Sequence, residues 1–207
     1  MRKLFITLII IACASFSISA QLQTGILLGG GTWGSMDAKA RPTTIENFKE
    51  HDVNFTSSFM LGYRFRLHHY DMPAFLDLDA MVGLKNWKSQ YGSRYNYGDN
   101  SGNDNQVIYG SSVNSNYVYT AIGATANYYV YNKLSVGAGI EPTIWVAKMG
   151  EDNSKTFDMP LVAKIGYDFK FLELGLTYKH SFINSVKTPY LDSGRFNDLQ
   201  LSVWVPF

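Results

Sequence analysis

Apolar and polar residues alternate along the last ten positions of the chain, 198–207. The apolar side chains share one parity: Leu199, Leu201, Val203, Val205 and Phe207. The polar side chains share the other: Asp198, Gln200 and Ser202. Side chains of a strand point alternately to its two faces, so this pattern predicts a strand with one apolar face that ends on an aromatic residue.

The same alternation recurs along the chain and predicts about eight strands. They cover residues 22–33, 55–67, 74–85, 117–131, 134–146, 159–170, 172–181 and 198–207. The gaps between them are alternately long (34–54, 86–116, 147–158, 182–197) and short (68–73, 132–133, around 171). Long loops at one end and tight turns at the other are typical of outer-membrane β-barrels. An even number of strands would place both chain ends beside the short turns.

Charged residues within these segments fall on the parity opposite the apolar one. They are Arg64, Arg66, Asp77, Asp79, Lys85, Glu141, Lys164, Asp168, Lys170, Glu173, Lys179 and Asp198. A basic side chain on the lipid face near mid-membrane costs about 2–4 kcal/mol, which favours this segregation. The pattern predicts an all-β, antiparallel transmembrane β-barrel of about eight strands. Its lumen would be filled by paired charges, without porin activity, because such a barrel has room only for side chains.

The first residues have the composition of a secretory signal. Arg2 and Lys3 precede an apolar run over 4–14, and small residues continue to Ala20. The run is too short to span a bilayer, so we expect a signal peptide at 1–20 and a barrel domain at 21–207. The location expected for an exported barrel is the cell outer membrane.

Cysteine usage agrees with an exported protein that has no disulfides. Cys13 is the only cysteine, and it lies within the expected signal peptide. A lipoprotein cleavage site before Cys13 is an alternative, but it would leave an apolar core of only 4–9, below the usual length. The exported domain would therefore have no thiol for a disulfide or a metal site.

Composition and charge narrow the class further. Aromatic residues make up 15% of the chain and charged residues 17%, with 18 glycines, which suits strands and turns better than a helical bundle. Without Arg2 and Lys3 the formal charge changes from +1 to −1, and no basic run occurs. We therefore expect no nucleic-acid partner. A mean hydropathy of −0.10 also argues against a helical membrane protein.

Aromatic residues near the segment ends predict two interfacial belts. The outer belt would contain Trp33, Phe55, Tyr117, Trp145 and Tyr178. The inner belt would contain Phe75, Tyr128, Tyr129, Phe169 and Phe207.

The export signal, the alternating segments, the regular gaps and the ending Val203-Trp204-Val205-Pro206-Phe207 resemble the small outer-membrane β-barrel proteins of Bacteroidota, the PorT-like group. Pro206 departs from the usual strand ending. The resemblance implies a membrane-embedded barrel whose relatives serve as adhesins, structural proteins or parts of secretion systems. It implies as partners outer-membrane lipids, the barrel assembly machinery, and an extracellular ligand or a secretion-system protein.

Two sequence motifs have the letters of a binding site without its context. Residues 29–34 match the dinucleotide fingerprint, which needs a strand–helix–strand unit around it. His68, His69 and Asp71 lie in one short gap, where three ligands rarely converge on a metal. We therefore expect neither a cofactor nor a metal site.

The function expected is non-enzymatic, structural or recognitional, through the extracellular loops. The gap 86–116 is rich in Asn, Ser and Gly and contains Tyr91, Tyr95, Tyr97 and Tyr109, a composition that suits adaptable contact surfaces.

Two alternatives remain open. His180 and Ser181, with Asp192 and Ser193 in the following gap, are candidates for an acyl hydrolase or transferase that modifies lipid A. Neighbours on a strand face opposite sides, which opposes His180 as the base for Ser181. The other alternative is a soluble periplasmic lipocalin-like binding barrel, which would show the same parity with the apolar face turned inward.

Overall fold

The computed structural model describes residues 20–40, 50–69, 72–95, 106–149, 155–187 and 191–207. Within these ranges the regular elements are all strands: β1 (Ala20–Ala40), β2 (Glu50–His69), β3 (Ala74–Tyr95), β4 (Gln106–Tyr131), β5 (Leu134–Ile140), β6 (Thr143–Met149), β7 (Phe157–Asp158), β8 (Pro160–Asp168), β9 (Glu173–Ser181) and β10 (Leu191–Pro206). None of the described residues belongs to a helix that is long and apolar enough to cross a membrane.

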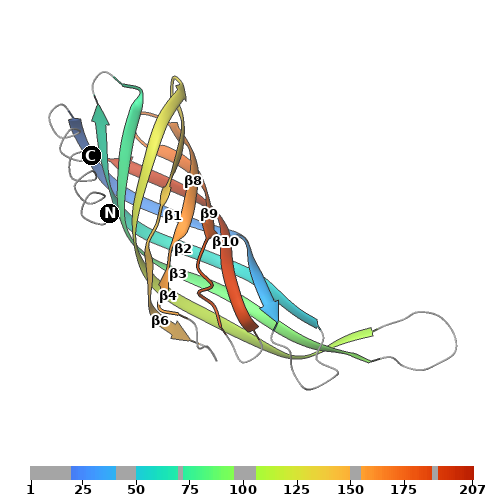
Figure 1. Ribbon diagram of the computed structural model, residues 1–207. Helices are drawn as coiled ribbons and strands as arrows, with labels where there is room; N and C mark the ends of the chain where they lie inside the picture. Colours follow the sequence, from blue (N-terminus) through green and yellow to red (C-terminus); the bar gives the residue numbers. More distant parts are fainter. Residues whose placement is uncertain (1–19, 41–49, 70–71, 96–105, 150–154, 188–190) are drawn as a thin grey trace, which may run out of the picture.

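The strands form one closed antiparallel barrel (Figure 1). Their order around the wall is β3-β2-β1-β10-β9-β8-β5-β4, and β4 pairs back onto β3 to close the ring of eight. Closure leaves these strands without a free edge along the paired part of the wall. The fold class predicted from the alternation is confirmed.

Two positions in the wall are each built from two short strands in line. β5 and β6 both pair with β4, and they are separated by Glu141 and Pro142. β7 and β8 are separated by Met159, just before Pro160. Proline has no N–H to donate to a ladder, which accounts for the interruptions. Their carbonyl groups stay paired: Pro142 O accepts from Ile122 N at 3.0 Å and Pro160 O from Glu141 N at 3.0 Å.

The short turns and both described chain ends lie at one end of the barrel, which we call the inner end (Figure 1). Two turn residues have positive φ, Asn132 at 38° and Lys170 at 76°. Lys170 N donates to Asp168 Oδ1 at 2.6 Å. Asp168 and Lys170 were predicted to face the lumen. For Lys170 that prediction is wrong, because Lys170 is exposed in the turn after β8. Asp168 is the last residue of β8, pairs with Glu173 and is half-buried on the inward parity of that strand, as predicted.

Each predicted strand coincides with one position in the wall, but several predicted boundaries are wrong. β1 continues to Ala40, β2 begins at Glu50, and the β3–β4 ladder continues to the pair Tyr95↔Gln106. Much of the predicted gaps 34–54 and 86–116 is therefore strand. Beyond a bilayer a strand needs no apolar face, so the alternation fades there while the backbone pairing continues.

Candidate functional site

The barrel has its polar side chains inside and its apolar side chains outside. Ten of the charged residues predicted to face the lumen are buried: Arg64, Arg66, Asp77, Asp79, Lys85, Glu141, Lys164, Glu173, Lys179 and Asp198. Large apolar side chains are exposed on the outer surface of the wall, such as Ile26 at 45% and Ile165 at 51%. A soluble barrel has the opposite arrangement. This orientation overturns the lipocalin-like interpretation and is that of a transmembrane β-barrel.

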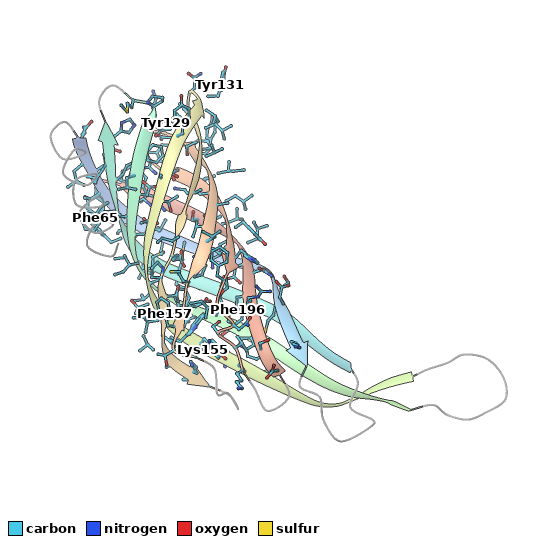
Figure 2. The ribbon with its side chains drawn as sticks, viewed as in Figure 1. Phe65, Tyr129, Tyr131, Lys155, Phe157 and Phe196 are labelled. Carbon is cyan, nitrogen blue, oxygen red and sulfur yellow. The ribbon has the colours of Figure 1, made fainter. Side chains whose placement is uncertain are left out.

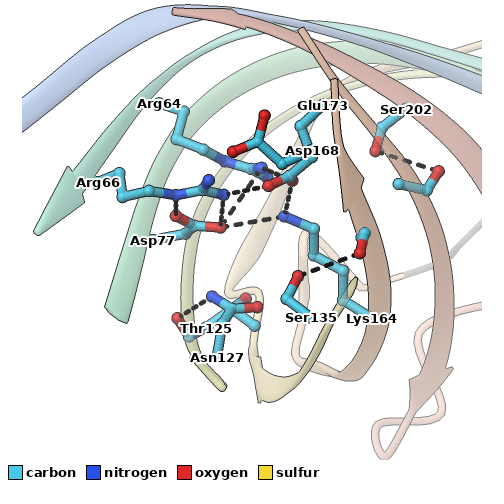
Figure 3. A network of polar contacts seen from close by, with 12 residues as sticks. Arg64, Arg66, Asp77, Thr125, Asn127, Ser135, Lys164, Asp168, Glu173 and Ser202 are labelled. Atoms are coloured by element: carbon cyan, nitrogen blue, oxygen red, sulfur yellow. Dashed lines mark hydrogen bonds and ion pairs between the residues drawn. The ribbon is translucent and has the colours of Figure 1, made fainter. Parts of the chain in front are cut away.

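Six charged side chains form a cluster near the inner end of the lumen (Figure 3). This inner ion cluster consists of Arg64, Arg66, Asp77, Asp79, Lys164 and Glu173. The carboxylate of Asp77 lies 2.7 Å from Arg66 Nε, 3.0 Å from Lys164 Nζ and 3.4 Å from Arg64 Nη1. Three basic and three acidic groups leave the cluster formally neutral.

Glu173 and Asp79 are the other two carboxylates of the cluster. The carboxylate of Glu173 lies 2.6 Å from Lys164 Nζ and 2.7 Å from Arg66 Nη2. Arg64 donates two hydrogen bonds to Asp79, at 2.7 and 2.8 Å. Charges removed from water need both partners and hydrogen bonds, and this network supplies them from four strands.

Aromatic rings cover the inner ion cluster. The guanidinium carbon of Arg66 lies 4.0 Å from the ring centroid of Phe75 and 4.2 Å from that of Trp204. His68 stacks on Phe75, with ring centroids 5.8 Å apart. Cation–π contacts of this kind are stronger where water is excluded. The inner end of the lumen is therefore packed with rings as well as with charges.

Two further ion pairs lie nearer the opposite, outer end of the lumen. Lys179 Nζ lies 2.7 Å from Glu141 Oε2, and Lys85 pairs with Asp198. A cavity beside these pairs has a volume of about 10 Å³. That is the space of about one water molecule, far below the several hundred Å³ of a ligand pocket.

An aromatic cap lies beyond these ion pairs, toward the outer end. It consists of Trp87, Tyr117, Trp145 and Phe196, all buried. Ring centroids are 6.0 Å apart for Trp87 and Tyr117, 5.2 Å for Tyr117 and Trp145, and 5.7 Å for Trp145 and Phe196. Phe196 is only 2% exposed, and Figure 2 labels it in the half of the barrel toward the outer end. Side chains therefore fill the lumen at this height too.

The segment 182–187 after β9 adds to this closure. Val186 is fully buried against the aromatic cap and exchanges backbone hydrogen bonds with Gly194, at 2.9 and 3.1 Å. Asp158 holds the start of the segment, because its carboxylate accepts from Ser181 Oγ and, at 3.4 Å, from Ser185 Oγ. Ser185 O accepts from Lys155 N at 2.8 Å. The chain thus turns inward over the lumen.

His180 and Ser181 do not form a nucleophile–base pair. Ser181 is buried and donates to Asp158, whereas His180 Nδ1 lies 2.6 Å from Asn197 Oδ1 on the other face of β9. Asp192 is exposed on β10. This geometry gives Ser181 an acceptor in place of a base and argues for a structural role.

Replacing Ser181 by alanine should lower the free energy of unfolding by about 1–3 kcal/mol, because Asp158 loses a buried donor. His180→Ala should change it by less than about 0.5 kcal/mol, since His180 is partly exposed. Urea unfolding of the refolded variants measures both values. Mass spectra of lipid A from cells that carry either variant should match those of the wild type. Altered lipid A together with unchanged stability would instead support catalysis.

The aromatic belts are only partly as predicted. Tyr178, Tyr128, Phe169 and Phe207 are exposed. Figure 2 shows Tyr131, which the sequence did not single out, at the inner end and Phe157 near the outer end. The prediction is wrong for Tyr117, Trp145 and Phe75, which are buried in the lumen. Phe75 and Trp145 share the inward parity of the charges in their segments, and Tyr117 shares that of the buried Thr125 and Asn127, so the alternation itself could have placed them. The side chains of Trp33 and Phe55 lie outside the described residues.

The two sequence motifs that resemble binding sites do not form such sites in the described residues. Residues 29–34 lie within β1, so the strand–helix–strand context of a dinucleotide site is missing there. Of the expected turn cluster, His68 packs on rings, whereas Asp71 and the side chain of His69 lie outside the described residues. The expected signal peptide also lies outside them, apart from the backbone of Ala20.

Among the described residues, Asp158 is the one buried charge that the alternation did not predict. β7 is only two residues long and is followed by a break, so no alternation could identify its inward face. Asp158 gives the described lumen one carboxylate more than it has basic groups. Its acceptors are satisfied by hydroxyl groups and by Met159 N, at 2.8 Å from Asp158 Oδ1.

Comparison with known proteins gives a likeness of shape alone. No protein-family model matches the chain, and no curated protein does. Among solved structures, the Ail attachment invasion locus protein of Yersinia pestis is similar over 92% of this chain and 100% of its own, at 11% identity and a TM-score of 0.39. The COG4313 outer membrane channel from Pseudomonas putida F1 is similar over 92% and 97%, at 10% identity and a TM-score of 0.33. Such values are too low for an inference about function.

Proposed function

We propose that this chain is a non-enzymatic outer-membrane protein that uses a closed barrel as an anchor and its outer end for surface recognition. One observation carries the proposal: the lumen is filled by ion pairs and rings, while the strands continue past it. The apolar exterior supports insertion in a bilayer, and a barrel of this kind is typical of outer membranes. Membership of the PorT-like group stays a prediction from the sequence pattern.

The outer end offers strand surface for a partner. The β4–β6 ladder ends at the pair Asn116↔Met149, and beyond it the described part of β4 pairs only with β3. The β9–β10 ladder ends at Asn197↔His180, beyond which β10 pairs with β1 and, at Gly194 alone, with Val186. Unpaired strand edges can accept an added strand, and tyrosines 91, 95 and 109 belong to these extensions.

The closed lumen predicts an absence of ion conduction. The refolded protein, inserted in a planar lipid bilayer, should give no stable current steps, because ion pairs and rings fill the lumen and the cavity beside Lys179 and Glu141 has a volume of only about 10 Å³. A general porin in the same bilayer is the control for insertion conditions. Stable steps from the wild-type protein would contradict a plugged lumen.

The recognition role predicts that the hairpin of β3 and β4 can be shortened without loss of the barrel. The variant lacks residues 90–112 and has Asn-Gly in their place. Because Gln90 pairs with Ser112 and Ser89 with Val113, this two-residue turn keeps the register of the remaining wall. Cells with the shortened protein should retain it in the outer membrane but adhere less to surfaces or to one another. Unchanged adhesion at equal protein levels would argue for a purely structural role.

A further inference from the structure

The wall of the barrel divides between β1 and β2 at one height. Their ladder runs from Ala20↔His69 to Gly31↔Ser58 and ends there, although both strands continue. Beyond that pair, the described part of β1 is bonded only to β10 and that of β2 only to β3. The backbone groups that face each other across this seam therefore have no ladder partner.

Irregular pairing on both sides accounts for the division. β1 shifts register against β10 between Gly30 and Trp33, and β2 shifts against β3 between Phe55 and Ser57. A bulge bends a strand and increases its local twist. Two bulges at the same height turn the strands away from each other.

A groove lies on the outer surface of the wall at this seam. Its volume is about 350 Å³, and it is lined by Gly30, Gly31, Ser57, Ser58, Leu176, Leu199 and Leu201. Gly30 occupies an outward position two residues after the exposed Leu28, so the wall lacks a side chain there. Leu201, 61% exposed, and Leu176 form the apolar side of the groove.

Polar side chains separate this groove from the lumen. Gln200 Nε2 donates to Ser58 Oγ at 3.1 Å, and Asn86 Nδ2 donates to Ser57 Oγ at 3.0 Å. Ser58 Oγ itself lies 3.5 Å from Gly31 O. The groove is therefore open toward the outside of the barrel, and these hydrogen bonds close it on the side of the lumen.

We propose that this groove binds one acyl chain of an outer-leaflet lipid, an inference that rests on the proposed function of the chain as an outer-membrane barrel. The leucines continue the exposed apolar surface of Ile26 and Phe59, so the groove is reached from the bilayer. Its leucine side offers water no hydrogen-bond partner and suits a hydrocarbon chain better. The unpaired backbone groups beyond the Gly31↔Ser58 pair need polar partners, which the ester and head groups of the same lipid supply.

The test is native mass spectrometry of the refolded protein in detergent, incubated with dipalmitoyl phosphatidylethanolamine. The wild type should retain one lipid at activation energies that remove surface lipids. Leu201→Trp fills the groove and should reduce the retained fraction at least about fivefold, because several methylene groups lose their contact. Leu201 suits the test better than Gly30, where an added Cβ would lie 2.9 Å from Ser58 O and disturb the wall.

The matched control is Ile165→Trp, which places the same ring on the lipid-facing surface of β8. It should retain the lipid as the wild type does. Equal loss of lipid in both variants would contradict lipid binding in the groove. So would the absence of retained lipid in a protein that still shows the heat-dependent gel shift of a folded barrel, and neither result would contradict the barrel itself. A protein that shows no such shift would overturn the proposed function as well.

Discussion

Replacing Asp77 by alanine should lower the free energy of unfolding by about 3–5 kcal/mol, because it leaves buried cations without their counter-ion. Asp77 is fully buried and lies within 3.4 Å of nitrogen atoms of Arg64, Arg66 and Lys164. Urea unfolding of the protein in lipid vesicles, followed by tryptophan fluorescence, measures the change. Trp204 is a local reporter, since its ring packs on Arg66.

Two further variants separate the charge effect from a general loss of packing. Asp192→Ala removes an exposed carboxylate on β10 and should leave stability within about 0.5 kcal/mol of the wild type. The double variant Arg66→Met, Asp77→Leu removes one charge of each sign and should be more stable than Asp77→Ala alone. If Asp77→Ala unfolded at the wild-type urea concentration, the inner ion cluster would not stabilise the barrel.

Placing a charge on the outer surface should have an effect of similar size. Ile26 lies on the exposed apolar row of β1, between Leu22 and Leu28. Ile26→Arg should lower the free energy of unfolding in vesicles by about 2–4 kcal/mol, because the guanidinium must enter hydrocarbon. The fraction that folds into vesicles, measured by gel mobility without heating, should fall with it.

The control for this change is Met149→Arg, at the outer end of β6. Near the membrane boundary the same charge costs about 0–1 kcal/mol, so Met149→Arg should fold almost as the wild type does. Equal effects at both positions would mean that depth in a bilayer does not govern the cost, contrary to a membrane-spanning wall.

Alternation predicted the parts of the fold in which one face meets lipid and the other meets the lumen. The segments 55–67 and 74–85 have such faces, and β2 and β3 place Arg64 and Asp79 inside as expected. The exposed apolar surface then distinguishes a membrane barrel from a soluble one, which parity alone could not do. That distinction requires the direction of the side chains relative to the barrel axis.

Other features of the fold depend on the register between strands, which the sequence of a single strand does not determine. The division of the wall at Gly31↔Ser58 follows from bulges on two strands that are distant in sequence. The joining of Asp77 to Lys164 brings together β3 and β8, which are not neighbours in the wall. Their contact across the lumen follows from closure and from the length of the lysine side chain.

In the aromatic cap, rings near strand ends face the lumen and not the membrane interface. Trp145 follows Thr143 on the inward parity of β6, and the structure buries both. Position near a strand end predicts a place at the membrane interface, where belts of aromatic rings are common. In this barrel several of them close the lumen instead, a role that parity indicates and position along the strand does not.

The most direct test of a membrane-spanning, side-chain-filled barrel is fractionation of cells that express the chain, followed by gels of unheated and boiled samples. Recovery in the outer membrane, with a mobility that changes on boiling, is the predicted result, since a closed barrel resists detergent until it is heated. Recovery as a soluble protein whose mobility is the same before and after boiling would contradict it.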